Sequence, residues 1–361
     1  MGTLRVRILH LGTDAYGGHG GIALYNRELI AAMASHPRVE EVVVVPRVIV
    51  TPELEPIPPK VRFVSDAARG RFAYMRALKS VTRGTTFDLV VCAHVNLLPI
   101  ARLVTRDPLL FVYGIEAWKP LRDPLSNRLL RGARAVVSIS DITSERFLGW
   151  SGYAGPTHIL PNSIRAEMYG IRPKNQELMA RFRLQGKRVL LTLGRVVAAE
   201  RYKGFDEVLE VLPDVARAHD DVAYIIAGGG NDLPRLARKA VTLGVAHRVL
   251  FTGLVREEEK ADLYNLAGVY VMPSRGEGFG FVFLEAMACG VPVIGSRLDG
   301  GREALRGGML GRLVDSTNPA EVRVALLDAL AENKRGVPEG LDYFSFASFE
   351  ERMHAILDRT T

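Results

Sequence analysis

Cysteine is scarce in this 361-residue sequence, which also lacks long apolar runs. Its two cysteines, Cys92 and Cys289, each lie inside an apolar stretch, so a disulfide scaffold is excluded. No apolar run approaches the roughly 18 residues that a membrane-spanning helix requires. The first residues lead into a strand-like pattern without the apolar region and cleavage site of a signal peptide. These absences predict a soluble protein of the reducing cytoplasm.

Several catalytic signatures are missing as well. The sequence has no G-x-S-x-G elbow, no Walker phosphate-binding loop and no cysteines and histidines at zinc-ligand spacing. It also has no Asp-x-Asp pair, which would supply the carboxylates for a metal that bridges a diphosphate. We therefore expect neither a metal site nor a bound cofactor.

The remaining composition is typical of globular proteins, with 48% hydrophobic and 24% charged residues. A chain of this length usually forms two domains. Residues 1–170 contain 21 basic and 14 acidic side chains, whereas residues 171–361 contain 26 of each. The basic first half suggests an anionic partner, such as a lipid headgroup, a phosphorylated substrate or nucleic acid. An arginine-rich solvated surface is the alternative.

Short β-branched runs alternate with stretches of helical spacing along most of the chain. The strands expected in the first half are Val6–Leu11, Val42–Val45, Leu89–Cys92, Leu109–Val112, Ala135–Ile139 and His158–Leu160. Those expected in the second half are Val189–Leu193, Ala223–Ala227, Val249–Phe251, Val269–Met272 and Val291–Ile294. The clearest helical stretches are Phe72–Val81, Phe205–Ala218, Leu233–Leu243, Glu257–Leu266, Phe281–Ala288 and Pro319–Glu332.

This alternation predicts an α/β protein with two Rossmann-like domains, each a doubly wound parallel sheet, that face a central cleft. The polar stretch Arg165–Gly186 separates the two series of elements and is interpreted as a linker with one short helix. We place the first domain at residues 1–168 and the second at residues 169–340. A last helix is expected within residues 341–361.

The most informative segment is Pro273–Ile294, where a predicted strand ends in a glycine-rich turn that opens a helix. Gly278 and Gly280 let the backbone approach a ligand, and the start of the helix offers unpaired N–H groups to an anion. Glu277 in the turn and Glu285 in the helix can accept hydrogen bonds from the vicinal hydroxyls of a ribose or a hexose. The alternative is a loop with ordinary surface glutamates.

A second segment, Gly194–Gly204, also lies between a predicted strand and a predicted helix. Arg195 and Lys203 are permanent cations there, and together they can hold a diphosphate. Solvated loop charges are the alternative.

Two glycine clusters, Tyr16–Gly21 and Ala227–Gly230, follow predicted strands without fitting the G-x-G-x-x-G pattern of dinucleotide-binding proteins. They permit a close backbone approach to a phosphate or a sugar. His19 and His94 lie at strand ends and are most simply structural histidines. Glu116 follows the fourth predicted strand, and its alternative role is a carboxylate at a helix N-terminus.

Together these segments resemble the retaining glycosyltransferases of the GT-B fold, in particular glycosyltransferase family 4. Glu277 and Glu285 match the family's E-x7-E signature. A second family signature is matched by Gly194, Arg195, Glu200, Arg201, Lys203 and Gly204. Gly20–Ala23 and Gly300–Gly311 also fit, so the resemblance covers nearly the whole chain.

The resemblance implies that the second domain holds a sugar nucleotide, that the first binds the acceptor, and that the last helix crosses back to the first domain. It assigns Arg195 and Lys203 to the diphosphate, Glu285 to the ribose and Glu277 to the transferred sugar. The other donor contacts that it implies come from Gly20, Gly21, Val255, Gly278, Phe279 and Gly280.

One position departs from the family pattern. Where the family often has His-Gly after the fourth strand, this chain has Tyr113-Gly114. A tyrosine hydroxyl can bind a sugar, but its pKa near 10 makes it a poor proton shuttle at neutral pH. The resemblance therefore gives Glu116 part of that histidine's role near the acceptor.

We predict a metal-independent enzyme that moves a hexose from GDP-mannose or a UDP-hexose to a glycan or lipid-linked acceptor with retention of configuration. The predicted catalytic residues are Glu277, Arg195, Lys203 and Glu116. Arg195, Lys203 and the helix N-terminus at Gly280 are expected to stabilise the departing diphosphate. A sugar-nucleotide epimerase of the same fold and a non-catalytic sugar-nucleotide-binding protein are the alternatives.

Part of the basic charge of the first half lies in residues 69–83. On a helix, Phe72, Met75 and Val81 can share one side, flanked by arginines and a lysine. Such a helix predicts peripheral binding to anionic lipid on the inner face of the cytoplasmic membrane. The alternative is a helix that packs on the sheet and leaves its cations in solvent. The sequence contains no nucleic-acid recognition module, so we expect no nucleic-acid partner.

Overall fold

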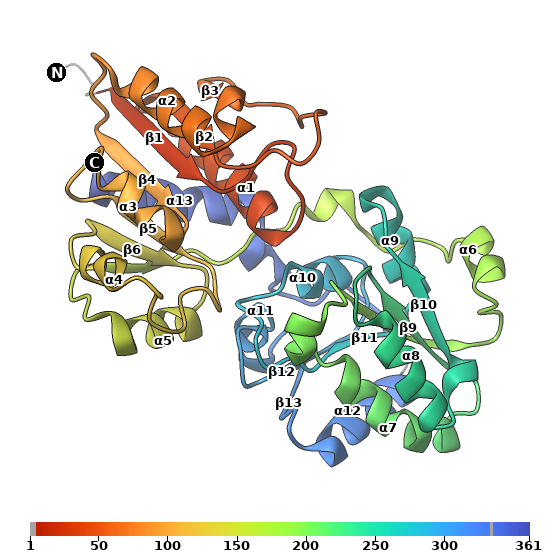
Figure 1. Cartoon of the computed structure of the whole chain (residues 1–361). Coiled ribbons are helices and arrows are strands. Elements are labelled where there is room, and N and C mark those ends of the chain that lie inside the picture. The colour runs from red at the N-terminus through yellow and green to blue at the C-terminus, as the bar shows by residue number, and fades with distance from the viewer. Residues whose placement is uncertain (1–4, 333–334) are drawn as a thin grey trace. The chain divides into compact units, whose positions relative to one another are not determined.

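The computed structural model describes residues 5–332 and 335–361, which form two compact units (Figure 1). The first unit ends at Ser163 and includes the C-terminal segment Phe346–Thr361, and the second is Ile164–Ser345. The sequence suggested divisions at residues 168 and 340. Residues 1–4, where the expected N-terminal pattern begins, lie outside the described residues.

The first unit is built on a seven-stranded parallel sheet with the order β3-β2-β1-β4-β5-β6-β7. Its strands are β1 (Val6–Gly12), β2 (Val39–Pro46), β3 (Val61–Phe63), β4 (Leu89–Ala93), β5 (Leu109–Val112), β6 (Ala135–Ser138) and β7 (Thr157–Ile159). The helices are α1 (Gly21–Ser35), α2 (Arg71–Thr82), α3 (Leu98–Ala101), α4 (Pro124–Leu130), α5 (Asp141–Ser151) and α13 (Phe346–Thr360).

Helices cover both faces of this sheet. Tyr74 and Leu78 of α2 join one core, whereas Tyr25 of α1 packs between Phe111 of β5 and Phe349 of α13, with ring centroids 6.3 and 5.5 Å away. The blue α13 therefore lies with the first unit, although it ends the chain (Figure 1).

The second unit has a six-stranded parallel sheet with the order β10-β9-β8-β11-β12-β13. Its strands are β8 (Arg188–Leu193), β9 (Val222–Ala227), β10 (Val249–Gly253), β11 (Val269–Met272), β12 (Val293–Ser296) and β13 (Arg312–Val314). The helices are α6 (Gln176–Arg181), α7 (Phe205–Ala218), α8 (Leu233–Thr242), α9 (Glu257–Leu266), α10 (Phe281–Ala288), α11 (Gly301–Ala304) and α12 (Pro319–Glu332).

The α/β class and the two parallel sheets agree with the prediction, and two edge strands were missed. β3 and β13 have three residues each, too few to show a period, and their mostly half-exposed side chains carry no apolar run. β12 begins at Val293 rather than Val291, because Pro292 has no N–H to give to a sheet. The α5 helix is capped by Ser140, whose hydroxyl accepts a hydrogen bond from the Thr143 N–H at 3.3 Å.

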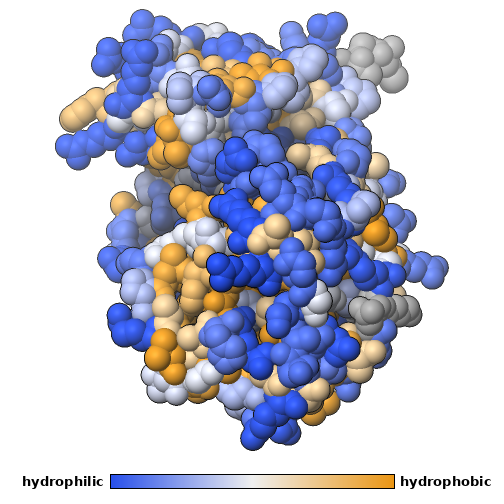
Figure 2. All heavy atoms as spheres, turned by 90° about the vertical axis from the view of Figure 1, so that its right-hand side faces the viewer, coloured by the Kyte–Doolittle hydropathy of each residue, from blue (hydrophilic) through white to orange (hydrophobic). Residues whose placement is uncertain are grey.

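Because each sheet is parallel, the carboxyl ends of its strands lie along one edge. In the first unit this edge carries the loops after β1, β4 and β5, and in the second the loops after β8, β10, β11 and β12. On the side where α6, α8 and α9 lie, hydrophilic residues cover most of the second unit (Figure 2). No helix among the described residues is long and apolar enough to cross a membrane.

Candidate functional site

The second unit brings together a cation and a carboxylate that sequence analysis assigned to two parts of the same sugar nucleotide. Lys203, at the end of the 3₁₀ helix η4 (Ala198–Lys203), places its Nζ 3.1 Å from Oε2 of Glu277 in the loop after β11. Glu200 lies 3.8 Å from the same Nζ and also pairs with Arg195, the second residue after β8. Burial works against the charge on Lys203, but the two carboxylates outweigh it and raise the pKa of the lysine.

Exposure distinguishes the two cations. The Lys203 side chain is 14% exposed, whereas that of Arg195 is 75% exposed. Arg195 therefore remains accessible to an anion from solvent, whereas the charge of Lys203 is held among its carboxylate partners. Glu200, which contacts both cations, had no assigned role in the sequence analysis beyond its match to the family signature.

The glycine-rich turn that carries Glu277 is held by Asp299, a residue that sequence analysis missed. Asp299 is fully buried in the loop after β12, and its Oδ2 accepts hydrogen bonds from Ser274 Oγ at 2.7 Å and from the Glu277 N–H at 2.8 Å. Its Oδ1 accepts from the Gly301 N–H at 3.0 Å. Burial raises the pKa of Asp299 to about 6. The signal in the sequence was an Asp-Gly-Gly run that begins five residues after the predicted strand Val291–Ile294.

Glycine is required at position 300 for steric reasons. A Cβ there would lie 2.0 Å from the Gly278 carbonyl oxygen, and the Gly300 N–H already donates to Glu277 O at 2.8 Å. The turn reaches α10 through Gly280, at φ +95°. The Phe279 side chain is buried against Phe344, so it has only its backbone to offer a ligand. These contacts fix the turn before any ligand arrives.

Glu285 lies in α10 and is 1% exposed. Its Oε2 accepts a hydrogen bond from the Tyr264 hydroxyl at 2.6 Å, and its Oε1 lies 3.4 Å from Lys260 Nζ. Both partners belong to α9 and were missed, because a helix of mixed composition gives no sign of which side chains turn toward α10. Val255 is half-buried in the loop between β10 and α9. The residues predicted for the diphosphate and the ribose, and Val255 among the other predicted donor contacts, thus come from loops and helices of one unit.

The Ala227–Gly230 cluster packs closely against the backbone that follows β8. A Cβ at Gly228 would lie 1.9 Å from Gly194 O, and one at Gly230 would lie 1.9 Å from Val196 O. The Val196 N–H donates to Gly229 O at 2.9 Å. These glycines approach the backbone that carries Arg195, so they position a candidate ligand-binding residue through the protein itself.

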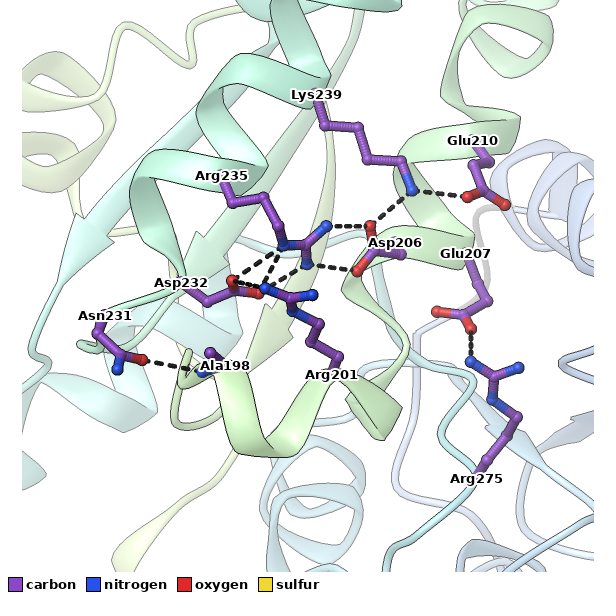
Figure 3. Close-up of polar contacts among 10 residues, drawn as sticks. All are labelled: Ala198, Arg201, Asp206, Glu207, Glu210, Asn231, Asp232, Arg235, Lys239 and Arg275. Atoms are coloured by element: carbon purple, nitrogen blue, oxygen red, sulfur yellow. Dashed lines mark hydrogen bonds and ion pairs between the residues drawn. The ribbon is translucent and has the colours of Figure 1, made fainter.

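An ionic network joins η4, α7 and α8 next to the segment that carries Lys203 (Figure 3). Asp206 of α7 accepts bonds of 2.6–2.7 Å from Arg235 and Lys239 of α8, and Arg235 and Arg201 both bond Asp232. Burial opposes the charge on Asp206, but these partners lower its pKa to about 2. The network borders a cavity of about 460 Å³ lined by Arg201, Asp206, Glu207, Glu210, Arg235, Lys239, Arg275, Ser316, Thr317 and Pro319.

Beside this network, Arg275 joins α7 to the glycine-rich loop after β11 that carries Glu277, which we call the donor loop. The Arg275 guanidinium forms an ion pair with Glu207 of α7, with Nη2 2.7 Å from the carboxylate (Figure 3). The backbone N–H of Arg275 donates to Tyr202 O at 2.8 Å. The cations around the cavity are matched by acids, so the network ties η4, α7, α8 and the donor loop together.

In the first unit, the glycine cluster after β1 divides into a packed part and an open part. A Cβ at Gly17 would lie 2.6 Å from Thr51 O, whereas one at Gly20 meets nothing within 4 Å. Gly20 and Gly21 are exposed at the start of α1. The packed part is held by Glu55, which accepts from the Gly17 N–H at 2.7 Å and pairs with Arg27 at 2.7 Å. Gly20 and Gly21 are therefore the accessible positions of this loop.

Tyr113 and Glu116 follow β5 and have separate partners. The buried Tyr113 hydroxyl donates to Asn26 Oδ1 at 2.9 Å, and burial raises the pKa of this tyrosine. Glu116 Oε1 accepts from the N–H groups of Tyr113 and Gly114 at 2.6 and 3.1 Å. The alternative of a carboxylate at a helix N-terminus does not hold for Glu116, because the next helix, α4, is capped by Asp123.

The basic helix predicted at residues 69–83 is α2, and its apolar residues divide between two sides. Phe72 is 74% exposed and Met75 is 40% exposed, but Val81 packs in the core beside Tyr74 and Leu78. The expectation that Val81 shares the exposed side was therefore wrong, because α2 needs that side chain to cover the sheet. Among residues 5–332 and 335–361, no group of three or more His, Cys, Asp or Glu side chains could hold a metal ion.

Comparison with known proteins finds a matching family model and similar relatives. The family model described as Glycosyl transferases group 1 matches residues 187–332. The chain is 33% identical over 230 residues to the GDP-mannose-dependent alpha-(1-6)-phosphatidylinositol monomannoside mannosyltransferase of Mycolicibacterium smegmatis. This match covers 62% of this chain and 59% of the relative. The chain is 34% identical over 258 residues to the protein of the same name from Mycobacterium tuberculosis, with 68% and 66% covered. The chain thus spans about three fifths to two thirds of these relatives.

Solved structures match over nearly the whole chain. Sucrose-phosphate synthase from Thermosynechococcus elongatus has a TM-score of 0.77 at 18% identity, covering 98% of this chain and 99% of that chain. The Anabaena protein HepE in complex with UDP and glucose has a TM-score of 0.74 at 18% identity, covering 98% and 100%. At this identity the likeness shows the fold, and the predicted GT-B architecture of two Rossmann-like domains is confirmed.

Proposed function

We propose that the protein is a glycosyltransferase that transfers a hexose from a sugar nucleotide to an acceptor hydroxyl, a proposal supported by the match of residues 187–332 to the Glycosyl transferases group 1 model. The acceptor is a glycan or a lipid-linked sugar. The observation that carries this proposal is the cluster of Arg195, Lys203 and Glu277 at one edge of the second sheet. It offers positive charge for a diphosphate beside a carboxylate for sugar hydroxyls. Nothing in the comparisons favours the epimerase or the non-catalytic alternative.

GDP-mannose is the donor to test first. The names of the relatives from two mycobacterial species specify GDP-mannose and a phosphatidylinositol mannoside. UDP-hexoses are the second choice, since HepE was solved with UDP and glucose. Glu285 suits either nucleotide, because a ribose presents the same vicinal hydroxyls in both.

The proposed reaction proceeds with retention of configuration and without a metal. The bond between the anomeric carbon and the diphosphate oxygen breaks, and the acceptor oxygen bonds to the same face of the sugar. The acceptor proton passes to the departing diphosphate. Arg195, Lys203 and the N–H groups at the start of α10 stabilise the negative charge that develops on the leaving group. In this proposal the two cations beside the phosphates take the role that a bridging metal would otherwise have.

The first unit is proposed to bind the acceptor and to touch anionic lipid at the cytoplasmic face of a membrane. Phe72 and Met75 provide exposed apolar surface on α2, and Arg76, Lys79 and Arg83 on the same segment are exposed cations. A basic helix with an exposed aromatic residue is suited to the interfacial region of a bilayer. This contact would bring the enzyme to a lipid-linked acceptor.

The proposal is tested by incubating the protein with GDP-mannose, UDP-glucose and UDP-galactose, each with phosphatidylinositol mannoside in mixed micelles. We expect one donor to release nucleoside diphosphate in step with a mannosylated or glucosylated lipid product seen by mass spectrometry. The Lys203→Ala variant should lose this activity, whereas Lys187→Ala, at an exposed lysine of the same unit, should keep it. If acceptor and donor together release no nucleoside diphosphate across a broad panel, the proposed function is wrong.

A further inference from the structure

Three polar side chains follow adjacent strands of the first sheet. Asp14 lies two residues after β1, His94 directly after β4, and Glu116 four residues after β5. β4 lies between β1 and β5 in the sheet, and all three strands are parallel. The three residues therefore lie along the carboxyl edge of the sheet, where open α/β sheets bind their ligands, and both carboxylates act electrostatically on His94. His94 has no role in the proposed function so far.

A buried relay holds the two outer loops in place. Asn26 of α1 is fully buried, donates from Nδ2 to Asp14 O at 2.8 Å and accepts from the Tyr113 hydroxyl at 2.9 Å. The Tyr113 backbone N–H in turn donates to Glu116 Oε1 at 2.6 Å. Because each of these groups has a defined partner, the relay fixes the positions of the Asp14 loop and of the Glu116 carboxylate.

His94 lies between these two loops with a defined tautomer. Its Nδ1 accepts a hydrogen bond from the Asn96 N–H at 3.1 Å, so in the neutral ring the proton is on Nε2. The ring centroid is 6.4 Å from that of Tyr113, and the residue is 9% exposed. Burial lowers the pKa of His94, and the nearby carboxylates of Glu116 and Asp14 oppose this only in part. At neutral pH His94 therefore presents an N–H donor between two acceptors.

This pattern of donors and acceptors fits a polyol. Each ring hydroxyl of a sugar or an inositol both donates and accepts, so vicinal hydroxyls can donate to the half-buried Asp14 and Glu116 and accept from His94. The three side chains do not form a group that could hold a metal ion. The two acids also disfavour a phosphate at this position, which leaves an uncharged hydroxylated ring as the ligand.

We propose that Asp14, His94 and Glu116 form the site for the hydroxylated ring of the acceptor, with His94 Nε2–H donating to a ring oxygen. The identification of this ring as the acceptor rests on the proposed function. The binding of a polyol to the first unit does not depend on catalysis. His94 is thus a substrate-contacting residue that the sequence analysis interpreted as structural.

Two substitutions of His94 separate the bond that its Nδ1 accepts from the Asn96 N–H from the bond that its Nε2–H is proposed to donate to the ligand. His94→Asn keeps an acceptor near the position of Nδ1 for the Asn96 N–H but removes the Nε2–H donor. His94→Gln carries an amide N–H to the position of Nε2. The probes are methyl α-D-mannopyranoside and myo-inositol, with binding to the full chain followed by saturation-transfer NMR. His19→Asn, at an exposed histidine after β1, is the matched control.

We expect one of the two polyols to bind the wild type, about 5- to 10-fold weaker binding to His94→Asn, and binding within about 3-fold of wild type for His94→Gln and His19→Asn. Binding of GDP should be equal in all four proteins. The inference is overturned if neither polyol binds the wild type, or if His94→Asn binds as the wild type does. A wild type that binds the polyol but transfers no sugar from any donor contradicts the proposed function instead.

Discussion

The two units of the chain show opposite relations between net charge and candidate site. The first half of the sequence carries the whole excess of basic residues, yet the strand ends of its sheet present Asp14, His94 and Glu116. The second half has equal numbers of acids and bases, yet the segment after β8 places Arg195 and Lys203 in its candidate site. The net charge of a region therefore does not tell which charge its site requires.

The difference follows from how each site is held. In the second unit, ion pairs fix the cations, as when Glu200 and Glu277 flank Lys203. In the first unit, hydrogen bonds from the uncharged Asn26 and Tyr113 hold the Asp14 backbone and the Glu116 carboxylate. The surplus cations of the first unit lie elsewhere, for example on α2. The paired cations of the second unit suit a diphosphate. The uncharged hydrogen-bonding groups of the first unit suit a polyol, and its exposed cations suit the proposed contact with anionic lipid.

The largest expected effect breaks the ionic site of the second unit. Lys203→Ala removes the cation next to the predicted diphosphate and leaves Glu200 and Glu277 without their shared partner. The loss of a charge-assisted contact costs about 1.5–3 kcal/mol, which corresponds to a fall of at least about 10-fold in transfer rate. Steady-state release of nucleoside diphosphate measures this, with Lys187→Ala as the control. Turnover near that of the wild type would contradict the diphosphate assignment.

The second prediction concerns the pH dependence of the ionic network. The pKa of Asp206 is lowered to about 2 in the folded protein, so its stabilisation is present above the ordinary pKa near 4 and is lost as pH falls toward 2. After screening by solvent we expect a loss of about 1–2 kcal/mol over this range. Urea unfolding between pH 5 and pH 2 should show it for the wild type.

Two variants make this measurement specific. Asp206→Asn should be less stable than the wild type at pH 6 and should lose the corresponding part of the acid dependence. Asp220→Asn, at an exposed aspartate of the same unit, should follow the wild-type curve. Identical acid dependence in Asp206→Asn and the wild type would show that Arg235 and Lys239 do not depend on this carboxylate.

The third prediction tests whether α2 of the first unit contacts anionic lipid. Flotation with phosphatidylglycerol vesicles at low salt should carry the wild type upward, and Phe72→Ser with Met75→Ser should reduce the bound fraction several-fold, since both remove exposed apolar surface from α2. Leu103→Ser is the matched control, because Leu103 is 71% exposed on the same unit but lies outside α2. Wild-type protein that stays with the soluble fraction would favour a soluble acceptor.

The smallest expected effect is that of a chelator. Because two cations are proposed to serve the diphosphate, treatment with EDTA should leave the transfer rate essentially unchanged. A complete loss of activity that Mg²⁺ or Mn²⁺ restores would mean that the negative charge of the leaving group is balanced by a metal.

The sequence was sufficient for the fold and for the residues that project from strand ends. Period and length determined α7, α9, α10 and α12 to their last residues, and the glycine turns marked Arg195, Lys203 and Glu277. It was not sufficient for partners brought close by folding. Asp299, Tyr264 and Asn26 lie far along the chain from the groups that they hold, so no local pattern identifies them. Gly228 and Gly230 show the same limit, because their need for glycine comes from backbone 34 residues away.

The binding of a nucleoside diphosphate to the second unit tests the central claim most directly. Calorimetric titration of the full chain with GDP and with UDP should show binding of at least one of them, with affinity about 10-fold lower in Arg195→Ala and unchanged in Arg238→Ala, at an exposed arginine of α8. Absence of binding by both nucleotides, or equal affinity in the wild type and Arg195→Ala, would contradict the account of this unit as the site of the sugar-nucleotide diphosphate.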